Sequence, residues 1–192
     1  QICVRYRRDI PSMMKYAALT IISDGANTRM GSQFTPEEYY YAWKKVENED
    51  PNGRVGIDEM EMLIKGALSP ERMLEILRDY VYFVDEAEAS KEIEIVCRYP
   101  QFFATRMLRD HIFHSLHSRG GNGKGGTYFG ATGCGKTHTM LFLARQLKCR
   151  YSTEMDNPTI IVIVDRTDLE DQSSKLFCNA KTYLEDENAK VF

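Results

Sequence analysis

The chain has 192 residues, of which 43% are hydrophobic and 28% charged, an ordinary composition for one or two globular domains. Its formal net charge of -3 argues against nucleic-acid binding by bulk positive charge, so any DNA contact must be local. Five cysteines without a Cys-x-x-Cys pair indicate neither a disulfide framework nor a zinc site, and they fit a cytoplasmic protein. No membrane span or signal peptide is predicted.

The first residues are expected to form a β-hairpin followed by a helix. Residues 18–23 and 26–30 flank the turn signal Asp24-Gly25 and predict the hairpin. Thr35-Pro36-Glu37-Glu38 has the order of an N-cap, a first-turn proline and a capping glutamate, which predicts a helix over about 36–46. The aromatic residues of this helix are expected to pack rather than to bind a ligand. They are Tyr39, Tyr40, Tyr41 and Trp43.

An acidic, turn-rich stretch over 47–56 predicts a domain boundary. Two helices are expected after it, one over 57–68 and one that starts at Ser69-Pro70-Glu71. A strand over 93–97 and a helix over 101–117 follow. The apolar face of the helix after Ser69 is expected to consist of Met73, Leu74, Leu77 and Tyr80.

Residues Gly130–Thr137 match the phosphate-loop pattern of a glycine, four variable positions and Gly-Lys-Thr. Glycines let such a loop turn tightly, so that backbone N–H groups point at phosphate oxygens. Lys136 would reach the β- and γ-phosphates, and Thr137 would place its hydroxyl on Mg²⁺. A β-prone run over 127–129 precedes the loop and a helical pattern follows it, as a nucleotide site requires. The alternative is a glycine-rich surface turn.

A continuous β-branched run over 159–164 predicts a strand buried on both faces of a parallel sheet. The polar block Asp165–Gln172 follows directly, at the strand end where open α/β sheets place ligand-contacting loops. The alternative is a helix N-terminus capped by Asp168, and both interpretations can hold together.

Taken together, these blocks resemble the restriction subunit of type I restriction-modification enzymes, an ATP-driven DNA translocase fused to a nuclease. Arg98–Ala104 resembles the family's adenine-reading Q motif, Gly125–Met140 its motif I and Val164–Gln172 its motif Ia. Residues 57–84 resemble the helical segment that joins nuclease to motor. The resemblance therefore extends over almost the whole chain.

This resemblance implies an α/β fold in three parts. A RecA-like P-loop parallel sheet, the first part of a motor lobe, would cover 93–192. A helical linker over 51–92 would precede it. The tail of an α/β restriction-endonuclease-like domain would cover 1–50, where Arg8–Pro11 and Ser23–Gly25 carry the likeness.

The resemblance also implies ATP and Mg²⁺ as cofactors and double-stranded DNA as a partner, with methyltransferase and specificity subunits in the same complex. The amide of Gln101 can both donate and accept hydrogen bonds, so it could match the adenine edge, or it could merely cap its helix. Lys136 is the catalytic residue and Thr137 the Mg²⁺ ligand expected within the chain. The expected nucleotide-binding residues are Gln101, Gly130, Thr132, Gly133, Cys134, Gly135, Lys136, Thr137 and His138, and the expected DNA-contacting residues are Arg166, Thr167 and Gln172.

The implied activity is that of an ATP-hydrolysing, site-specific type I deoxyribonuclease. The chain alone is expected to be inactive, because in this family the acidic Walker B box and the arginine finger would follow Phe192 and the nuclease metal ligands would precede Gln1. The alternatives are another superfamily 2 DNA helicase or translocase, a small P-loop kinase, and a nonenzymatic nucleotide-binding interaction fragment.

Overall fold

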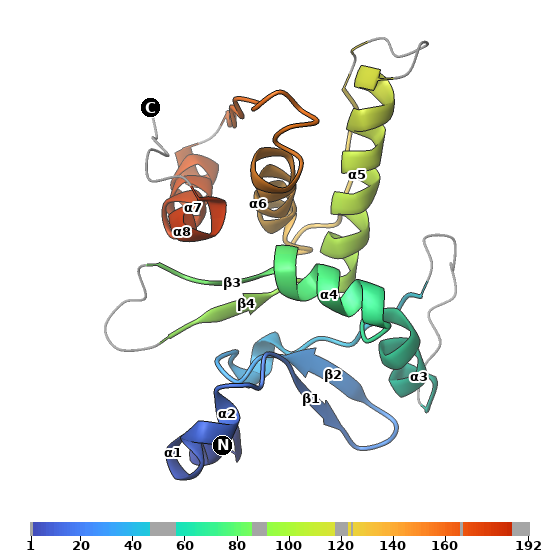
Figure 1. Cartoon of the computed structure of the whole chain (residues 1–192), viewed down its shortest axis with the longest axis vertical. Coiled ribbons are helices and arrows are strands. Elements are labelled where there is room, and N and C mark those ends of the chain that lie inside the picture. Colours follow the sequence, from blue (N-terminus) through green and yellow to red (C-terminus); the bar gives the residue numbers. More distant parts are fainter. Residues whose placement is uncertain are drawn as a thin grey trace. The chain divides into compact units, whose positions relative to one another are not determined.

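The structure, a computed structural model, describes residues 2–46, 57–85, 92–117, 123, 125–165 and 167–185. These residues form helices and two small antiparallel sheets, so the fold is mixed α/β. The chain divides into two units, residues 1–99 and 100–192 (Figure 1). The boundary predicted over 47–56 lies outside the described residues.

The first unit contains two hairpins and two longer helices. In chain order its elements are α1 (Ile2–Asp9), α2 (Pro11–Met14), β1 (Thr20–Ser23), β2 (Thr28–Gly31), the 3₁₀ helix η1 (Glu37–Tyr39), α3 (Ile57–Gly66), α4 (Pro70–Asp79), β3 (Val81–Phe83) and β4 (Glu94–Val96). β1 pairs with β2 in antiparallel register, which confirms the first hairpin. Its turn is fixed by Asp24, whose carboxylate accepts the N–H of Asn27 at 2.7 Å, and by Gly25, whose φ is 93°.

The helix predicted over 36–46 is wrong. Only η1 is helical there, and Tyr40 is already extended, with φ of -77° and ψ of 129°. Tyr41 forms an antiparallel bridge with Met30 of β2, through backbone hydrogen bonds of 2.9 and 3.1 Å. The bridge extends the hairpin and buries Tyr40. These tertiary contacts outweigh the local preference for a helix.

The two helices predicted after residue 56 are confirmed as α3 and α4. Trp43, only 2% exposed, lies over Gly66 at the end of α3, where a Cβ would come within 2.5 Å of the indole. The buried face of α4 differs from the predicted one. Tyr80, which was predicted, is fully buried, but so is Ile76, which was not, and the predicted Leu74 is 63% exposed.

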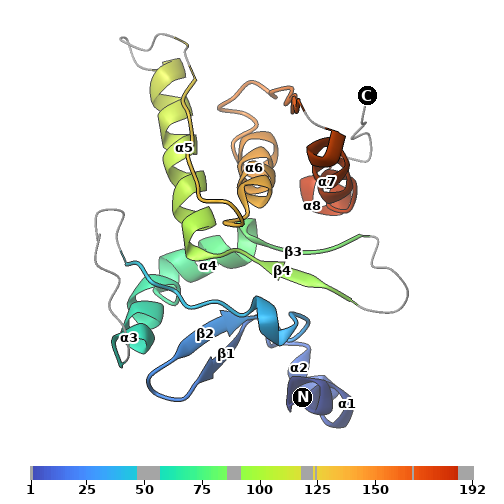
Figure 2. The same ribbon diagram turned by 180° about the vertical axis from the view of Figure 1, so that it is seen from behind.

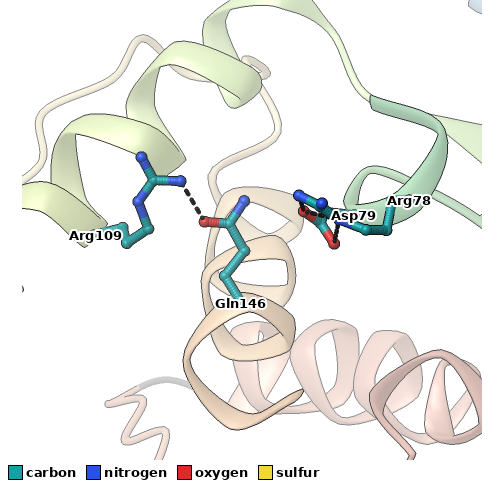
Figure 3. Close-up of polar contacts among 4 residues, drawn as sticks. All are labelled: Arg78, Asp79, Arg109 and Gln146. Carbon is teal, nitrogen blue, oxygen red and sulfur yellow. Dashed lines mark hydrogen bonds and ion pairs between the residues drawn. The ribbon is translucent and has the colours of Figure 1, made fainter. Parts of the chain in front are cut away.

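β4 confirms the strand predicted over 93–97, and it pairs with β3, which was not predicted. β3 is only three residues long, too short for strand periodicity to be recognised. Just before β3, the guanidinium Nε of Arg78 donates to both carboxylate oxygens of Asp79 at 3.0 Å (Figure 3). Asp79 is buried, so this pairing compensates a carboxylate removed from water.

In the described part of the second unit, every assigned element is a helix. The elements are α5 (Tyr99–His117), which begins at the last residue of the first unit, α6 (Lys136–Arg145), the π-helix η2 (Gln146–Arg150), α7 (Thr167–Cys178) and α8 (Lys181–Leu184). α6 lies between α5 and the α7–α8 pair in both views (Figure 1 and Figure 2). No helix in the described part of the chain is long and apolar enough to cross a membrane.

Two polar contacts join α5 to α6. The amide of Gln101 donates to the carbonyl of Gly135 at 3.3 Å. The guanidinium of Arg109 donates to the side-chain oxygen of Gln146 at 3.3 Å (Figure 3). Because the contacts follow the same order along both helices, α5 and α6 run parallel. α6 is therefore held at its start and at its end.

The parallel sheet predicted for this unit is not formed among the described residues. The segments 127–129 and 159–164 are assigned to no strand, because a strand is defined by ladder hydrogen bonds and no described segment pairs with either. Phe129 is 93% exposed, and Ile161 and Ile163 are 77% and 88% exposed. The mixed α/β class holds, and the RecA-like sheet stays a prediction.

Candidate nucleotide-binding site

The loop Gly130–Thr137 leads directly into α6. Gly133 and Gly135 have φ values of 79° and 80°, a left-handed conformation that glycine adopts without strain. Gly135 is the N-cap of α6, and its carbonyl accepts the first helical hydrogen bond from the N–H of Thr139 at 3.1 Å. The helix start predicted directly behind the loop is therefore confirmed.

The first turn of α6 presents backbone N–H groups to the loop. They belong to Lys136, Thr137 and His138, the first residues of α6, where backbone N–H groups point out of the start of the helix. The positive end of the helix dipole lies at the same place. An anion with several acceptor oxygens, such as a phosphate chain, matches this arrangement. Thr132 is exposed on the loop, and the ring of His138 lies 6.4 Å from that of Phe142.

The side chain of Lys136 folds back over the loop. Its Nζ donates to the carbonyl oxygens of Gly130 at 2.8 Å and Ala131 at 3.1 Å. The ammonium is thus already above the loop, and phosphate oxygens would offer it stronger, charge-assisted hydrogen bonds. Thr137 adds a hydroxyl in the first turn of α6, the oxygen-ligand type that Mg²⁺ accepts. These residues fit a Mg²⁺-bound nucleotide.

Gln101 lies against the loop although the two are 34 residues apart. Its side chain is 5% exposed, and its amide nitrogen donates to the carbonyl of Gly135. A Cβ at position 135 would come within 2.2 Å of that nitrogen. Glycine at 135 is therefore needed for its left-handed conformation, and a side chain there would also displace the amide end of Gln101. The reading of adenine by Gln101 stays a prediction.

Sequence patterns alone did not single out Tyr128 and Thr139. A Cβ at Gly130 would lie 2.8 Å from the Cys134 Sγ and 3.1 Å from the Tyr128 hydroxyl oxygen, so these two side chains meet above Gly130. Thr139, one turn into α6, is 1% exposed, and its hydroxyl oxygen lies 3.5 Å from the carbonyl oxygen of Gly135. Burial is the main cause that raises the pKa of Tyr128, and the charge of the Cys134 thiolate adds to it. The only sequence indication was the position of Tyr128 two residues before the loop.

The predicted DNA-contacting residues are only partly described. Thr167 begins α7 and Gln172 lies within it, both exposed, whereas Arg166 lies outside the described residues. Among the described residues, neither Thr167 nor Gln172 hydrogen-bonds to the phosphate loop. Glu170 and Asp171 are also exposed on α7. Contact between these residues and DNA stays a prediction.

Residues 100–191 match the SWI2/SNF2 ATPase family. The match includes the phosphate loop, α6 and Gln101, and it supports a helicase-like motor class for the second unit. No solved structure matches the chain.

The chain is also similar to endonuclease subunits of type I restriction enzymes, which confirms the resemblance seen in its motifs. It is 29% identical to the HindI endonuclease subunit of Haemophilus influenzae over 93% of the chain and 17% of that protein. Two Methanocaldococcus jannaschii proteins, provisionally named as the MjaIXP and MjaVIIP endonuclease subunits, are 25% identical over 88% of the chain and 37% identical over 57%. The chain spans less than a fifth of the length of these relatives, between 10% and 17%.

Proposed function

We propose that this chain binds Mg²⁺-ATP through Gly130–Thr137 and forms part of the motor of a type I restriction enzyme, which moves along double-stranded DNA and cleaves it. The loop geometry carries the proposal: two left-handed glycines, a lysine above the loop and a helix N-terminus directly behind it. The ATPase family match and the restriction-enzyme relatives support the same function.

In this function the N–H groups of Lys136, Thr137 and His138 would bind phosphate oxygens. Lys136 would exchange the carbonyls of Gly130 and Ala131 for the β- and γ-phosphates, and its exposed side chain can do so with little rearrangement. The Thr137 hydroxyl would hold Mg²⁺, which neutralises phosphate charge when bound. Gln101 would face the adenine edge while it supports the loop.

We also propose that, in the full-length protein, 127–129 and 159–164 are strands of a RecA-like parallel sheet to which residues 93–192 contribute the first part. The β-branched run 159–164, whose isoleucines are exposed, supports this, because such runs form strands buried on both faces of parallel sheets. In the same proposal, residues 51–92 are a helical linker and residues 1–50 the tail of a nuclease domain.

The whole protein would act in the cytoplasm together with methyltransferase and specificity subunits. Its DNA contacts would include Arg166, Thr167 and Gln172, which offer a cation, a hydroxyl and an amide to phosphates without reading bases. The restriction-enzyme relatives support these partners.

DNA-stimulated ATP hydrolysis by a full-length protein carrying this sequence tests the proposal. A motor should release phosphate faster when double-stranded DNA is added, and Lys136→Ala should abolish the release. Lys148→Ala, in η2 and outside the loop, is the matched control and should keep it. A small P-loop kinase would instead phosphorylate an acceptor without DNA, and a nonenzymatic binder would show no turnover. Either result would contradict the proposed motor function.

A further inference from the structure

The end of α6 that lies away from the phosphate loop is held by Arg109 of α5. We propose that Arg109 is a positioning residue of the nucleotide site: its bond to Gln146 fixes the place of α6 along α5, and so sets the spacing between Gln101 and the phosphate loop. The inference rests on the proposed nucleotide-binding function, in which Gln101 faces the adenine edge while the loop holds the phosphates. Arg109 and Gln146 lie outside every motif recognised in the sequence.

The face of α5 that carries Arg109 also carries Gln101. Gln101, Thr105 and Arg109 follow one another at intervals of four residues, which places them on one side of the helix. All three are enclosed: Gln101 is 5% exposed, Thr105 is fully buried, and the side chain of Arg109 is 11% exposed. One helix therefore carries both the residue that would face adenine and the residue that holds the far end of α6.

Gln146 is the residue of the α6 end that Arg109 contacts. It follows the last residue of α6, begins the π-helix η2 and is fully buried. Its side-chain oxygen accepts a hydrogen bond from the Arg109 guanidinium at 3.3 Å (Figure 3). The N–H of Tyr151 donates to the backbone carbonyl of Gln146 at 2.8 Å. A buried amide oxygen that lost its donor would cost free energy, so this contact holds the end of α6 at Arg109.

The guanidinium of Arg109 is itself fixed on two further sides. Its Nε donates to the carboxylate of Asp110 at 2.8 Å, and its Nη2 lies 2.7 Å from the same oxygen. Its Cζ lies 5.5 Å from the centre of the Tyr151 ring, and that ring lies 5.2 Å from the ring of Phe113 on α5. Because the guanidinium is planar and rigid, these contacts hold the donor that faces Gln146 in a defined direction.

Two points of contact fix α6 where one would not. At the start of α6, Gln101 donates a neutral hydrogen bond to the Gly135 carbonyl at 3.3 Å. A helix held at one end can still pivot, or slide by a residue along its neighbour, a step of about 1.5 Å. The contact at Gln146 opposes this movement. A nucleotide that reaches from Gln101 to the loop should depend on the spacing between them, whereas pyrophosphate, which has no base, should not.

Arg109→Met, which keeps an unbranched apolar side chain and removes the guanidinium, tests the proposal in this chain. It should lower the affinity for Mg²⁺-ADP about three- to tenfold and leave the affinity for Mg²⁺-pyrophosphate unchanged, because the loop itself is intact.

Arg145→Met is the matched control. The side chain of Arg145 is 18% exposed, and its guanidinium donates to the Tyr183 carbonyl and to the Glu185 carboxylate and lies over the Tyr183 ring. These partners lie in and just behind α8 and not on α5. The control should therefore keep the wild-type ratio of ADP to pyrophosphate affinity.

A double-variant cycle separates positioning from a general loss of stability. In a Gln101→Ala background, Arg109→Met should cause little further loss of ADP affinity, because no amide remains to be placed. Gln146→Met removes the same bond from the other side and should show the same selective loss as Arg109→Met, so either variant gives the result if the other does not fold. Additive losses, or equal losses for ADP and pyrophosphate, would overturn the proposal.

Lys136→Ala distinguishes the failure of this proposal from the failure of the proposed function. It should weaken the binding of both ADP and pyrophosphate, because both would bind through the loop. If it left both affinities unchanged, the assignment of the nucleotide site would be wrong, and the role of Arg109 with it. If it weakened both while Arg109→Met kept the wild-type ratio, the role of Arg109 alone would be wrong.

Discussion

The phosphate loop and the segment 159–164 lie in the same unit but differ in what holds them. The loop is bonded within itself and to α5: Lys136 contacts carbonyls five and six residues back, and Gln101 contacts Gly135. The segment 159–164 pairs with no described strand, and most of its apolar side chains are exposed. Substitutions in and behind the loop should therefore have large effects in this chain. Substitutions in the segment should have small ones.

The largest expected contrast is between Leu141→Ala and Ile163→Ala. Leu141 is fully buried in α6, so its truncation should lower the free energy of unfolding by about 2–5 kcal/mol. Ile163 is 88% exposed, and its truncation should cost no more than about 0.5 kcal/mol. Urea unfolding followed by circular dichroism measures both. Equal losses would show that 159–164 is buried in solution and would remove the contrast.

A glycine series sharpens the contrast within the loop. Gly135→Ala combines a φ of 80° with a Cβ that would clash with Gln101, so it should cost about 1–3 kcal/mol of stability and weaken Mg²⁺-ADP binding. In Gly133→Ala the new Cβ meets no atom within 4 Å. Only the left-handed φ of 79° should then lower the stability, by about 1–2 kcal/mol. Gly125→Ala, with neither constraint, is the control. A comparable loss in Gly125→Ala would contradict this ranking.

Gln101→Ala tests the tertiary contact of the loop. It should reduce the preference for ATP over GTP by about five- to tenfold, the effect of about one good hydrogen bond. It should also weaken the binding of both nucleotides slightly, because the hydrogen bond from Gln101 to the Gly135 carbonyl is lost. Competition binding with ATP and GTP measures the ratio. An equal loss of affinity for ATP and for GTP would mean that Gln101 supports the loop and does not bind the adenine edge.

The smallest expected effect is that of Arg166→Ala on DNA. It should weaken DNA binding of a full-length protein by a similar factor on every sequence and lower the salt dependence by about one phosphate contact. Lys175→Ala, on the exposed surface farther along α7, controls for the loss of a positive charge. A loss confined to one DNA sequence would indicate base reading instead.

The elements that could be predicted have short-range causes. The β1–β2 hairpin follows from Asp24 and Gly25, α4 from the proline that begins it, and the start of α6 from the loop glycines. Each cause lies within a few residues of its effect, so the sequence pattern contains it.

The elements that could not be predicted depend on distant contacts. The helix expected over 36–46 was replaced by a bridge between Tyr41 and Met30, which no local pattern indicates. In the site, the approach of Gln101 was expected only through a family resemblance. The meeting of Tyr128 with Cys134 was not expected, because the phosphate-loop pattern leaves both positions unspecified.

Isothermal calorimetry of Mg²⁺-ATP binding to this chain tests the central claim most directly. Wild type should bind, and Lys136→Ala should show no measurable binding, because the loop would lose the cation that reaches the β- and γ-phosphates. Lys148→Ala removes a lysine of the same unit outside the loop and should bind as wild type does. Equal affinity of wild type and Lys136→Ala would contradict the assignment of Gly130–Thr137 as the nucleotide site.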